Sequence, residues 1–351
     1  MKGQAVANKD VNVFFTLGTG SLREEFWGDV AQRRADELGF TVRLNPKHGP
    51  QPPDYWAEAF EGVEALITTW GAPKLDETVL ARNTTLKIVG HAAGAVAGLV
   101  SPALYERGVR VVTANAIMAQ TVAEWCLMTT QIGSNRFLEY AGIGSIRPMR
   151  WEDRQMATSM HNTTVAIWGY GQISSRLIRL LQPLAPKEIL VYSGHLQPHE
   201  AEEIGVTLVD FDALFERGDI IHLLGALTER NVGKVEASQL AKIKDDSLLI
   251  NAGRAMLVDE AALLAELRKN RFRAFFDVYY KEPLPEDSPL RGLPNVVLTP
   301  HLAGRGTEGL YVPHALEEFD RFFRGEPLTS EVSPERAAMM TNQAAMRKKK
   351  S

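Results

Sequence analysis

Short apolar runs alternate with longer amphipathic stretches along the whole chain. In the first third, runs of β-type residues predict strands at residues 11–17, 41–44, 65–68, 86–89 and 109–112. A helical pattern over residues 22–38 follows the first run, and the prolines between residues 48 and 53 predict a loop, because proline interrupts both helix and strand. This alternation is typical of a parallel sheet with helices on its faces.

A second alternating region follows a helical segment at residues 117–140 and a loop up to Trp151 that is rich in glycine, proline and arginine. Strands are expected there at residues 163–168, 188–192, 206–208, 220–223, 247–251, 274–278 and 296–298. A last helix is expected at residues 311–324, where it can return to the first region. The predicted fold class is α/β, with two doubly wound parallel-sheet domains, Rossmann-like or flavodoxin-like, and a cleft between them.

Composition and charge narrow the function classes. Hydrophobic residues make up 45% of the 351 residues and charged residues 23%, which is ordinary for a globular protein of two domains. A net charge of −4 gives no electrostatic reason to expect nucleic acid or an anionic membrane as a partner. The one basic run, residues 347–350, is expected to belong to a disordered tail at residues 339–351.

Cysteine usage and hydropathy predict the compartment. The single cysteine, Cys126, lies in an apolar helical pattern, which predicts a buried thiol, and a chain without an internal disulfide fits a reducing compartment. The first ten residues are polar and lack the apolar stretch of a signal peptide. No window approaches the roughly 18 to 20 apolar residues that a membrane helix needs. We therefore expect a cytoplasmic protein, and we expect no metal site.

A glycine-rich turn between a predicted strand and a predicted helix indicates a dinucleotide site. Gly169 and Gly171 begin the sequence GYGQIS, which leads into a helical pattern at residues 173–181. The first glycine permits the tight turn, and the second lets the backbone approach a pyrophosphate at the helix N-terminus. Ser174 stands where a third glycine is usual. A similar turn at residues 18–21 lacks the remaining glycine spacing and a phosphate-binding lysine, so we expect an ordinary strand-to-helix turn there.

The residues at the end of the second strand of this region bear on the choice between NAD and NADP. Ser193 stands where a carboxylate usually binds the ribose 2′-hydroxyl, and the missing charge removes a barrier to the 2′-phosphate of NADP. No arginine follows to bind that phosphate, and only Ser193 and His195 are available to contact it. NAD and NADP both remain open, with a slight lean to NADP.

Three polar residues follow successive predicted strands. Arg254, Glu282 and His301 come after the strands near residues 247–251, 274–278 and 296–298, at the sheet edge where α/β proteins bind ligands. A guanidinium can bind a carboxylate with two parallel hydrogen bonds. A histidine can transfer the proton that accompanies hydride, and a carboxylate can orient the ring and raise its pKa. The set predicts hydride transfer between NAD(P)H and a small 2-keto acid or 2-hydroxy acid.

Residues 66–334 resemble the D-isomer-specific 2-hydroxyacid dehydrogenases. The resemblance lies in the sequences GYGQI (169–173), NAGR (251–254), VDE (258–260), DV (277–278), EPLP (282–285) and TPHLAG (299–304). It implies that His301 is the acid/base catalyst, that Glu282 is its partner, and that Arg254 anchors the substrate carboxylate and carbonyl. It also implies a substrate (lid) domain at residues 1–115 plus 306–338 and a dinucleotide-binding domain at residues 116–305.

The same resemblance assigns the remaining site residues and a homodimer. Dinucleotide contacts are implied for Gln172, Ile173, Ser193, Leu224, Ala252, Asp277 and Gly304, with Asp277 near the nicotinamide. A substrate loop is implied at Ala93, Gly94 and Ala95, with Trp70 across from it, where a wall for the substrate side chain and a core position are equally expected for Trp70. The homodimer would form through the dinucleotide domains, with residues 117–140 and the Trp151 loop as candidate contacts. The chain departs from the family at Ser174, Ser193, Leu224, Ala226 and Ala255.

Two other functions stay open at this point. A dinucleotide-binding regulator with the same fold could have lost turnover, because function resides in the site and not in the fold. A dehydrogenase of formate or phosphite would share the fold and much of the site. Formate enzymes of this superfamily carry glutamine in place of the glutamate, so Glu282 argues against formate, whereas phosphite stays open.

Overall fold

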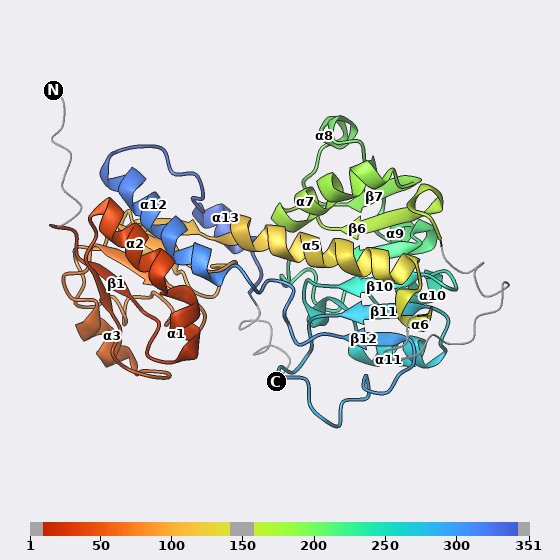
Figure 1. Cartoon of the computed structure of the whole chain (residues 1–351), viewed down its shortest axis with the longest axis horizontal. Coiled ribbons are helices and arrows are strands. Elements are labelled where there is room, and N and C mark those ends of the chain that lie inside the picture. The colour runs from red at the N-terminus through yellow and green to blue at the C-terminus, as the bar shows by residue number, and fades with distance from the viewer. Residues whose placement is uncertain (1–9, 141–157, 343–351) are drawn as a thin grey trace. The chain divides into compact units, whose positions relative to one another are not determined.

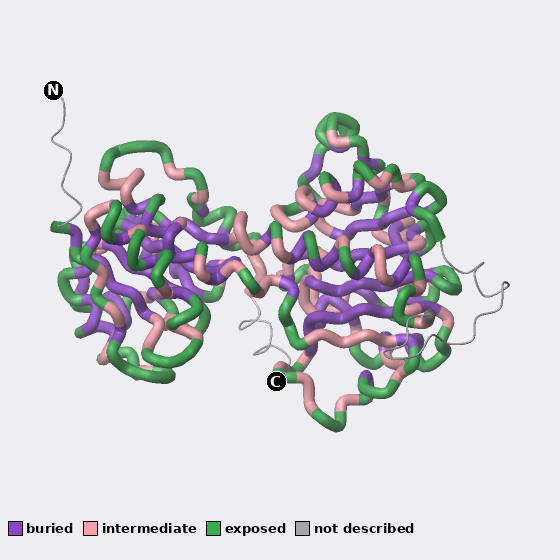
Figure 2. The backbone as a smooth tube through the Cα atoms, in the orientation of Figure 1, coloured by how far each residue is buried: buried purple, intermediate pink, exposed green. Residues whose placement is uncertain are grey.

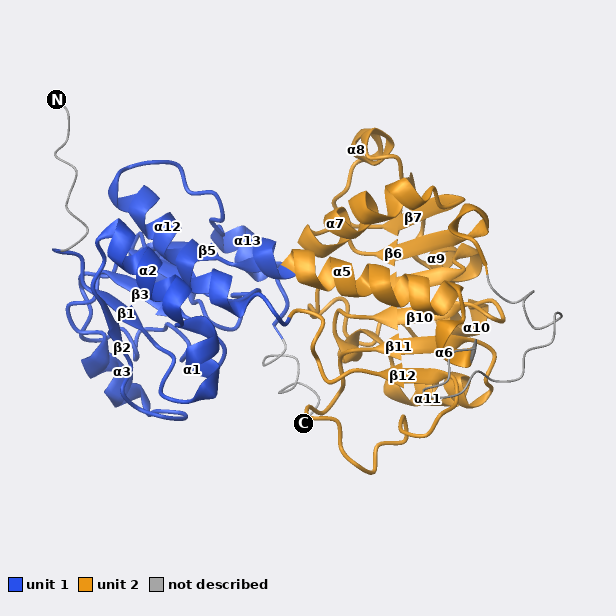
Figure 3. Ribbon diagram, viewed as in Figure 1, with its two compact units in different colours: residues 1–118, 305–351 blue, residues 119–304 orange. Residues whose placement is uncertain are grey.

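A computed structural model of the chain describes residues 10–140 and 158–342 (Figure 1). The chain forms two compact units (Figure 3). Unit 1 contains residues 1–118 together with 305–351, and unit 2 contains residues 119–304. Both are α/β units built on a parallel sheet, as the alternating pattern predicts.

The sheet of unit 1 has five parallel strands in the order β2-β1-β3-β4-β5. The strands are β1 (Val13–Phe15), β2 (Val42–Leu44), β3 (Ala65–Thr68), β4 (Ile88–His91) and β5 (Arg110–Thr113). This order is that of flavodoxin-like proteins. Because all five strands are parallel, their carboxyl ends meet at one edge of the sheet. All five strands predicted in the first region are confirmed.

Helices cover both faces of this sheet. They are α1 (Ser21–Phe26), α2 (Asp29–Leu38), α3 (Pro53–Ala59), α4 (Pro102–Glu106), α12 (Tyr311–Phe323) and α13 (Pro334–Ala338), with a short 3-10 turn η6 (Glu308–Leu310). The expected return of the last helix to the first region is confirmed, because α12 packs on β4 so closely that a Cβ atom on Gly90 would lie 2.8 Å from the Ala315 Cβ. The prediction of one helix over residues 22–38 is wrong. The chain breaks at Trp27 and Gly28, where Gly28 adopts extended backbone as the N-cap of α2.

The sheet of unit 2 has seven parallel strands in the order β12-β11-β10-β9-β6-β7-β8. They are β6 (Thr164–Trp168), β7 (Glu188–Tyr192), β8 (Thr207–Leu208), β9 (Ile220–Leu223), β10 (Leu248–Asn251), β11 (Arg273–Phe276) and β12 (Val296–Leu298). The order is that of a Rossmann sheet with one added strand. From β6 the strands are added toward one edge as far as β8, and from β9 they are added toward the other edge, so the strand order reverses between β6 and β9. Ligands bind outside the strand ends at such a reversal, which is where the glycine-rich turn follows β6.

Helices also flank this second sheet. They are α5 (Asn115–Ser134), α6 (Phe137–Tyr140), α7 (Gln172–Leu181), α8 (Pro198–Glu203), α9 (Phe211–Arg217), α10 (Ala237–Lys242) and α11 (Glu260–Arg268), with 3-10 turns η3 (Met160–Asn162), η4 (Gln182–Leu184) and η5 (Ala255–Leu257). The prediction of one helix over residues 117–140 is wrong, because α5 ends at Ser134 and Arg136 turns the chain with a φ of 50°. The Trp151 loop lies outside the described residues.

The central strands form the buried core of each unit (Figure 2). Every residue of β1, β3, β4, β6, β9 and β10 is buried, as expected for parallel strands covered on both faces. The predicted burial of Cys126 is confirmed, and burial raises the pKa of its thiol far above the ordinary value. No helix in the described part of the chain is long and apolar enough to span a membrane.

Candidate active site

The glycine-rich turn after β6 has the geometry that phosphate binding needs. Gly169 has a φ of 98°, and a Cβ atom there would lie 2.9 Å from the Leu224 carbonyl oxygen, so only glycine fits. A Cβ atom on Gly171 would meet nothing within 4 Å, which leaves open space beside the second glycine. Gly171 is the N-cap of α7, and no side chain caps this helix. The N–H groups of its first turn are therefore available to an anion such as a pyrophosphate.

The residues after the second glycine support this site. The Gln172 side-chain oxygen lies 2.5 Å from Nη1 of Arg176, which donates to it, so the Gln172 amide is held with its NH₂ group directed elsewhere. Ile173 lies in the first turn of α7 beside it. Ser174 is buried, which agrees with close packing of helix and strand at the third position of the motif. The turn and the start of α7 thus fit a dinucleotide.

The Ser193 side chain caps the turn that follows β7. Its hydroxyl oxygen accepts hydrogen bonds from the N–H groups of His195, at 3.3 Å, and Leu196, at 3.2 Å. The His195 ring joins this turn to the glycine-rich turn, because its Nε2 lies 2.6 Å from the carbonyl oxygen of Tyr170. The residue that usually supplies a carboxylate at this position is therefore a neutral turn-capping residue in this chain.

His301 and Glu282 form a hydrogen-bonded pair in unit 2. His301 Nδ1 lies 3.1 Å from Glu282 Oε2, and the other oxygen of Glu282 accepts the Tyr279 N–H at 3.0 Å. An ionised carboxylate only accepts hydrogen bonds, so Nδ1 donates and Nε2 is left for another molecule. Nε2 has no hydrogen-bond partner among the described residues, and the His301 side chain is 43% exposed. This arrangement suits transfer of a proton at Nε2.

The charge of Glu282 follows from its surroundings. Burial raises the pKa of this carboxyl. Hydrogen bonds from His301 and from the Tyr279 N–H lower the pKa, as do the positive charges of His301 and Arg254, and together these effects outweigh burial. The net effect is a pKa below the ordinary value. Glu282 is therefore ionised at neutral pH and can stabilise a protonated imidazole.

Asp277 fixes the loop that carries His301. This buried carboxylate follows β11, and Oδ1 accepts from the Thr299 hydroxyl at 2.6 Å and from the Leu302 N–H at 2.8 Å. The second oxygen accepts from the Ala303 N–H at 2.9 Å. His301 sits between these anchors with a φ of 52°, in the left-handed region, so the loop needs such support. Sequence reasoning missed this role; a lone aspartate at the end of an apolar strand was the available signal.

Arg254 follows β10 on the same edge of the sheet. The side-chain amide of Asn251, the last residue of β10, donates to the Arg254 carbonyl oxygen at 3.1 Å, and Arg254 Nη1 donates to the Gly253 carbonyl oxygen at 2.6 Å. Its charge is one of those that lower the pKa of Glu282. The three residues predicted to be catalytic therefore follow β10, β11 and β12 within one unit.

The remaining predicted dinucleotide contacts flank this edge. The N–H of Leu224, which follows β9, donates to the Trp168 carbonyl oxygen at 3.0 Å, so Leu224 borders the glycine-rich turn. Ala252 is buried directly after β10, and Gly304 closes the His301 loop as the last residue of unit 2. Their contacts with a dinucleotide stay predictions. Among the described residues, no group of three His, Cys, Asp or Glu side chains is placed to bind a metal ion.

The predicted substrate loop follows β4 in unit 1. The Thr113 hydroxyl lies 2.8 Å from the carbonyl oxygen of Ala93 and 2.7 Å from that of Gly94, which turns both carbonyls inward. The N–H groups of Gly94 and Ala95 have no acceptor among the described residues. Backbone N–H groups left in this way suit a carboxylate. His91 before them is buried against Thr68, and burial lowers its pKa to about 4, so it is neutral.

Trp70 lies beside this loop. It follows β3, whose last residue accepts the Ala92 N–H through the Thr68 carbonyl oxygen at 2.7 Å. The Trp70 ring meets the Phe26 ring edge to face at 5.3 Å and is 38% exposed. Trp70 is therefore not a core residue. Of the two roles expected for it, the core position is wrong, and the wall for the substrate side chain stays a prediction.

A histidine–carboxylate pair on the same sheet edge as a glycine-rich turn is typical of nicotinamide-dependent dehydrogenases. Comparison with known proteins gives the same class. The family model described as "D-isomer specific 2-hydroxyacid dehydrogenase, NAD binding domain" matches residues 137–303. Glyoxylate/hydroxypyruvate reductase B of Escherichia fergusonii is 30% identical over 288 residues, which cover 81% of this chain and 87% of that protein.

Two further similarities agree. D-3-phosphoglycerate dehydrogenase of Archaeoglobus fulgidus is 32% identical over 247 residues, which cover 70% of this chain but only 46% of that longer protein. The structure of D-lactate dehydrogenase with NAD⁺ from Lactobacillus jensenii has the same fold, with a TM-score of 0.72 at 20% identity, covering 92% of this chain and 100% of that one. The chain belongs to the D-isomer-specific 2-hydroxyacid dehydrogenase family. Its reaction is hydride transfer between a nicotinamide dinucleotide and a 2-keto or 2-hydroxy acid.

The Glu282 charge gives a first prediction. Glu282→Gln is expected to lower kcat by about 10- to 1,000-fold, because a neutral amide stabilises a protonated His301 far less than a carboxylate does. Since the pKa of Glu282 lies below its ordinary value, the pair keeps its charge above that lowered pKa and loses it as the pH falls through it. The wild-type acidic limb that Glu282 causes should be absent from the variant, as measured by the pH profile of kcat/KM.

Glu286→Gln is the matched control, since Glu286 is an exposed carboxylate four residues further along the same loop. It should leave both kcat and the pH profile unchanged. A Glu282→Gln enzyme with the wild-type rate and the wild-type acidic limb would contradict the assigned pairing.

Proposed function

We propose that this protein reduces small 2-keto acids to D-2-hydroxy acids with His301 as the acid/base catalyst. The observation that carries the proposal is the His301–Glu282 pair, in which Nδ1 is engaged and Nε2 is available. The dinucleotide, when bound, supplies the hydride. His301 Nε2 gives its proton to the keto oxygen during reduction and takes it back during oxidation. Glu282 stays ionised and stabilises the charged ring.

Arg254 and the loop at Ala93, Gly94 and Ala95 bind the substrate in this proposal. The Arg254 guanidinium anchors the carboxylate and offsets the negative charge that grows on the keto oxygen. The backbone N–H groups of Gly94 and Ala95 donate to the carboxylate. Residues 1–115 with 306–338 act as the substrate domain, and residues 116–305 act as the dinucleotide-binding domain.

The substrate proposed is a small 2-keto acid such as glyoxylate or hydroxypyruvate. The support is the similarity to glyoxylate/hydroxypyruvate reductase B, which extends over 87% of that protein.

The configuration of the product tests the proposed reduction to D-2-hydroxy acids. Reduction of hydroxypyruvate should yield D-glycerate, as resolved by chiral chromatography. L-glycerate as the main product would contradict it.

The cofactor is nicotinamide adenine dinucleotide, since the matched family model describes an NAD-binding domain. We propose that NADP, the 2′-phosphorylated form, is also accepted and is slightly preferred over NAD. The support is the neutral Ser193, whose hydroxyl caps a turn where a carboxylate would repel that phosphate. No metal takes part in this proposal.

Ser193→Asp is expected to move the preference toward NADH. A carboxylate there binds the ribose 2′-hydroxyl and repels a 2′-phosphate, so the ratio of the Kd for NADPH to that for NADH should rise by about tenfold or more. Fluorescence titration of each reduced dinucleotide measures both constants. Ser193→Asn is the neutral control of the same shape, and it should move the ratio far less. Equal ratios for the aspartate and asparagine variants would show that this position does not choose the cofactor.

We further propose a cytoplasmic homodimer. The support for the compartment is the chain's single, buried cysteine. The support for the dimer is the exposure of large apolar side chains on α5 and α6, at Met128, Phe137 and Leu138. The Trp151 loop, a second candidate contact, lies outside the described residues.

A further inference from the structure

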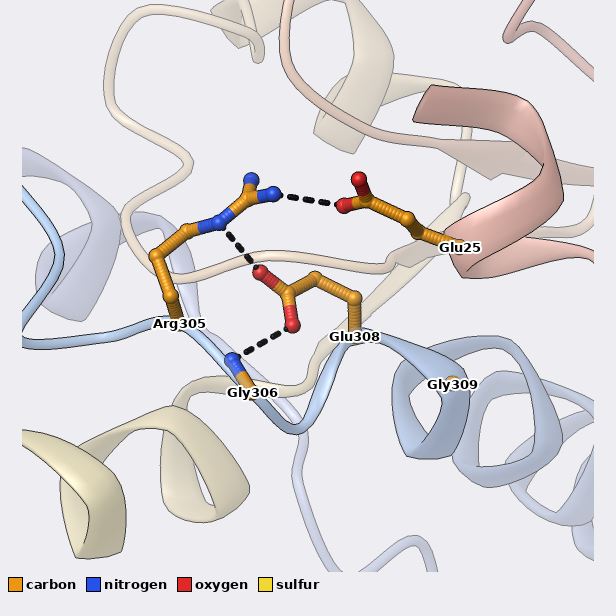
Figure 4. Close-up of a pocket in the computed structure, with 5 residues that line it drawn as sticks. All are labelled: Glu25, Arg305, Gly306, Glu308 and Gly309. Atoms are coloured by element: carbon orange, nitrogen blue, oxygen red, sulfur yellow. Dashed lines mark hydrogen bonds and ion pairs between the residues drawn. The ribbon is translucent and has the colours of Figure 1, made fainter. Parts of the chain in front are cut away.

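Arg305 is the centre of a charged network in unit 1 (Figure 4). Its Nη2 lies 2.5 Å from Glu25 Oε2, and its Nε lies 2.8 Å from Glu308 Oε1. The second oxygen of Glu308 accepts the Gly306 N–H at 2.7 Å, so this carboxylate is held on both sides. Glu25 belongs to α1, and Glu308 begins η6. Two elements far apart in the sequence thus fix one guanidinium.

The same guanidinium covers the indole ring of Trp70. The Arg305 guanidinium carbon lies 5.5 Å from the Trp70 ring centroid, within the range of a cation–π contact. The edge-to-face contact with Phe26 supports the ring from another direction. With Arg305 and Phe26 both in contact with it, Trp70 is a rigid aromatic surface that is still partly exposed.

The network lies at the edge of the sheet that carries the proposed carboxylate loop. The Thr69 hydroxyl donates to the Ala92 carbonyl oxygen at 3.3 Å, which ties the residue before Trp70 to the residue before Ala93. In the sequence, Arg305 comes only four residues after His301. A substrate whose carboxylate binds the N–H groups of Gly94 and Ala95 therefore has Trp70 and the charged network as its neighbours in unit 1.

The network carries a net negative charge. Glu25 and Glu308 contribute two negative charges, and Arg305 contributes one positive charge that both carboxylates already share. The Glu25 side chain is 45% exposed and that of Arg305 is 40% exposed, so a ligand meets these charges directly. An open surface depression of about 400 Å³ is lined by Glu25, Arg305, Gly306, Glu308 and Gly309. A further anion placed there would face net repulsion.

We propose that Trp70 and the Glu25–Arg305–Glu308 network select 2-keto acids with a small neutral side chain and reject those that carry a second anionic group. The inference rests on the proposed function and names the substrate class of the same site. The ring offers an apolar surface to the side chain. The positive charge of Arg305 is already shared by two carboxylates, so the network offers no net positive charge to a phosphate or a second carboxylate, and a new anionic ligand would have to displace Glu25.

Hydroxypyruvate and its 3-phosphate ester are the matched test pair, because they differ only in the anionic group. The wild-type protein should use hydroxypyruvate at least about 100-fold better by kcat/KM. Glu25→Gln removes one negative charge of the network and should narrow this ratio by about tenfold at low salt, and less at high salt, where charges are screened. Glu24→Gln is the control, since Glu24 is an exposed carboxylate on the same helix, and its ratio should equal that of the wild type.

The Kd of each keto acid for the dinucleotide-bound protein, measured by calorimetry, separates this inference from the proposed function. Tighter binding of hydroxypyruvate without turnover of either compound would overturn the proposed function and support the selection. Equal kcat/KM or equal Kd for the two compounds in the wild type would overturn the selection while the reductase function stands. An unchanged ratio in Glu25→Gln would also overturn it.

Discussion

His301→Ala is expected to lower kcat for 2-keto acid reduction by about 10²- to 10⁴-fold while the dinucleotide still binds. The variant loses the imidazole that Glu282 orients and whose Nε2 is available to a substrate, so the keto oxygen must take its proton from water. Dinucleotide binding should persist because the glycine-rich turn and α7 make no hydrogen bond to His301 among the described residues. Steady-state rates give kcat, and fluorescence titration with the reduced dinucleotide gives its Kd.

His199→Ala is the control for this variant. His199 is exposed on α8, away from the strand ends that carry the catalytic set, and its loss should change neither kcat nor the Kd. Wild-type turnover in His301→Ala would remove this histidine from the reaction. Loss of dinucleotide binding together with turnover would show instead that the substitution had disturbed the fold of the loop held by Asp277.

Arg254→Ala is expected to lower kcat/KM by about 30- to 1,000-fold, which corresponds to roughly 2–4 kcal/mol for charge-assisted hydrogen bonds to the substrate. We expect KM to rise and kcat to fall. The guanidinium binds the substrate carboxylate in the ground state, and it offsets charge on the keto oxygen in the transition state. Arg254→Lys keeps the charge but loses the planar pair of donors, so it should recover only part of the loss. Steady-state measurement of kcat and KM with one keto acid resolves the two effects.

Arg268→Ala provides the matched control for charge. Arg268 is exposed at the end of α11, and its removal should leave kcat/KM within about twofold of the wild type. If the Arg254→Ala and Arg254→Lys enzymes both kept the wild-type KM, the assignment of the carboxylate anchor to Arg254 would be wrong.

The positions of the strands could be predicted from the sequence because they depend on local apolar runs. β3, β7, β9 and β12 have the predicted bounds, and the remaining strands lie within three residues of theirs. The helix ends near residues 27 and 135 could not be predicted in the same way. They depend on single residues in non-helical conformations, Gly28 as an N-cap and Arg136 at a φ of 50°, inside patterns that continue to look helical.

The catalytic set could be predicted because parallel strands bring their carboxyl ends to one edge. Arg254, Glu282 and His301 each follow a strand, so the order of β10, β11 and β12 alone places them on the same side of the sheet. The partners that support the site could not be predicted. Asp277 reaches the His301 loop across two strand ends, and Arg305 pairs with Glu25 over 280 positions of sequence. The position of Asp277 after an apolar strand is visible in the sequence, but the partners of both residues depend on tertiary packing, which the local pattern does not record.

We expect the His301–Glu282 pair to belong to a working reductase and not to a silent dinucleotide-binding regulator. The most direct measurement follows the loss of nicotinamide absorbance when the purified protein meets glyoxylate, hydroxypyruvate or pyruvate, with NADH and separately with NADPH, in samples whose dinucleotide binding is measured in parallel. We expect many turnovers per protein molecule with at least one keto acid. Saturable dinucleotide binding without turnover of any keto acid in the panel would contradict it.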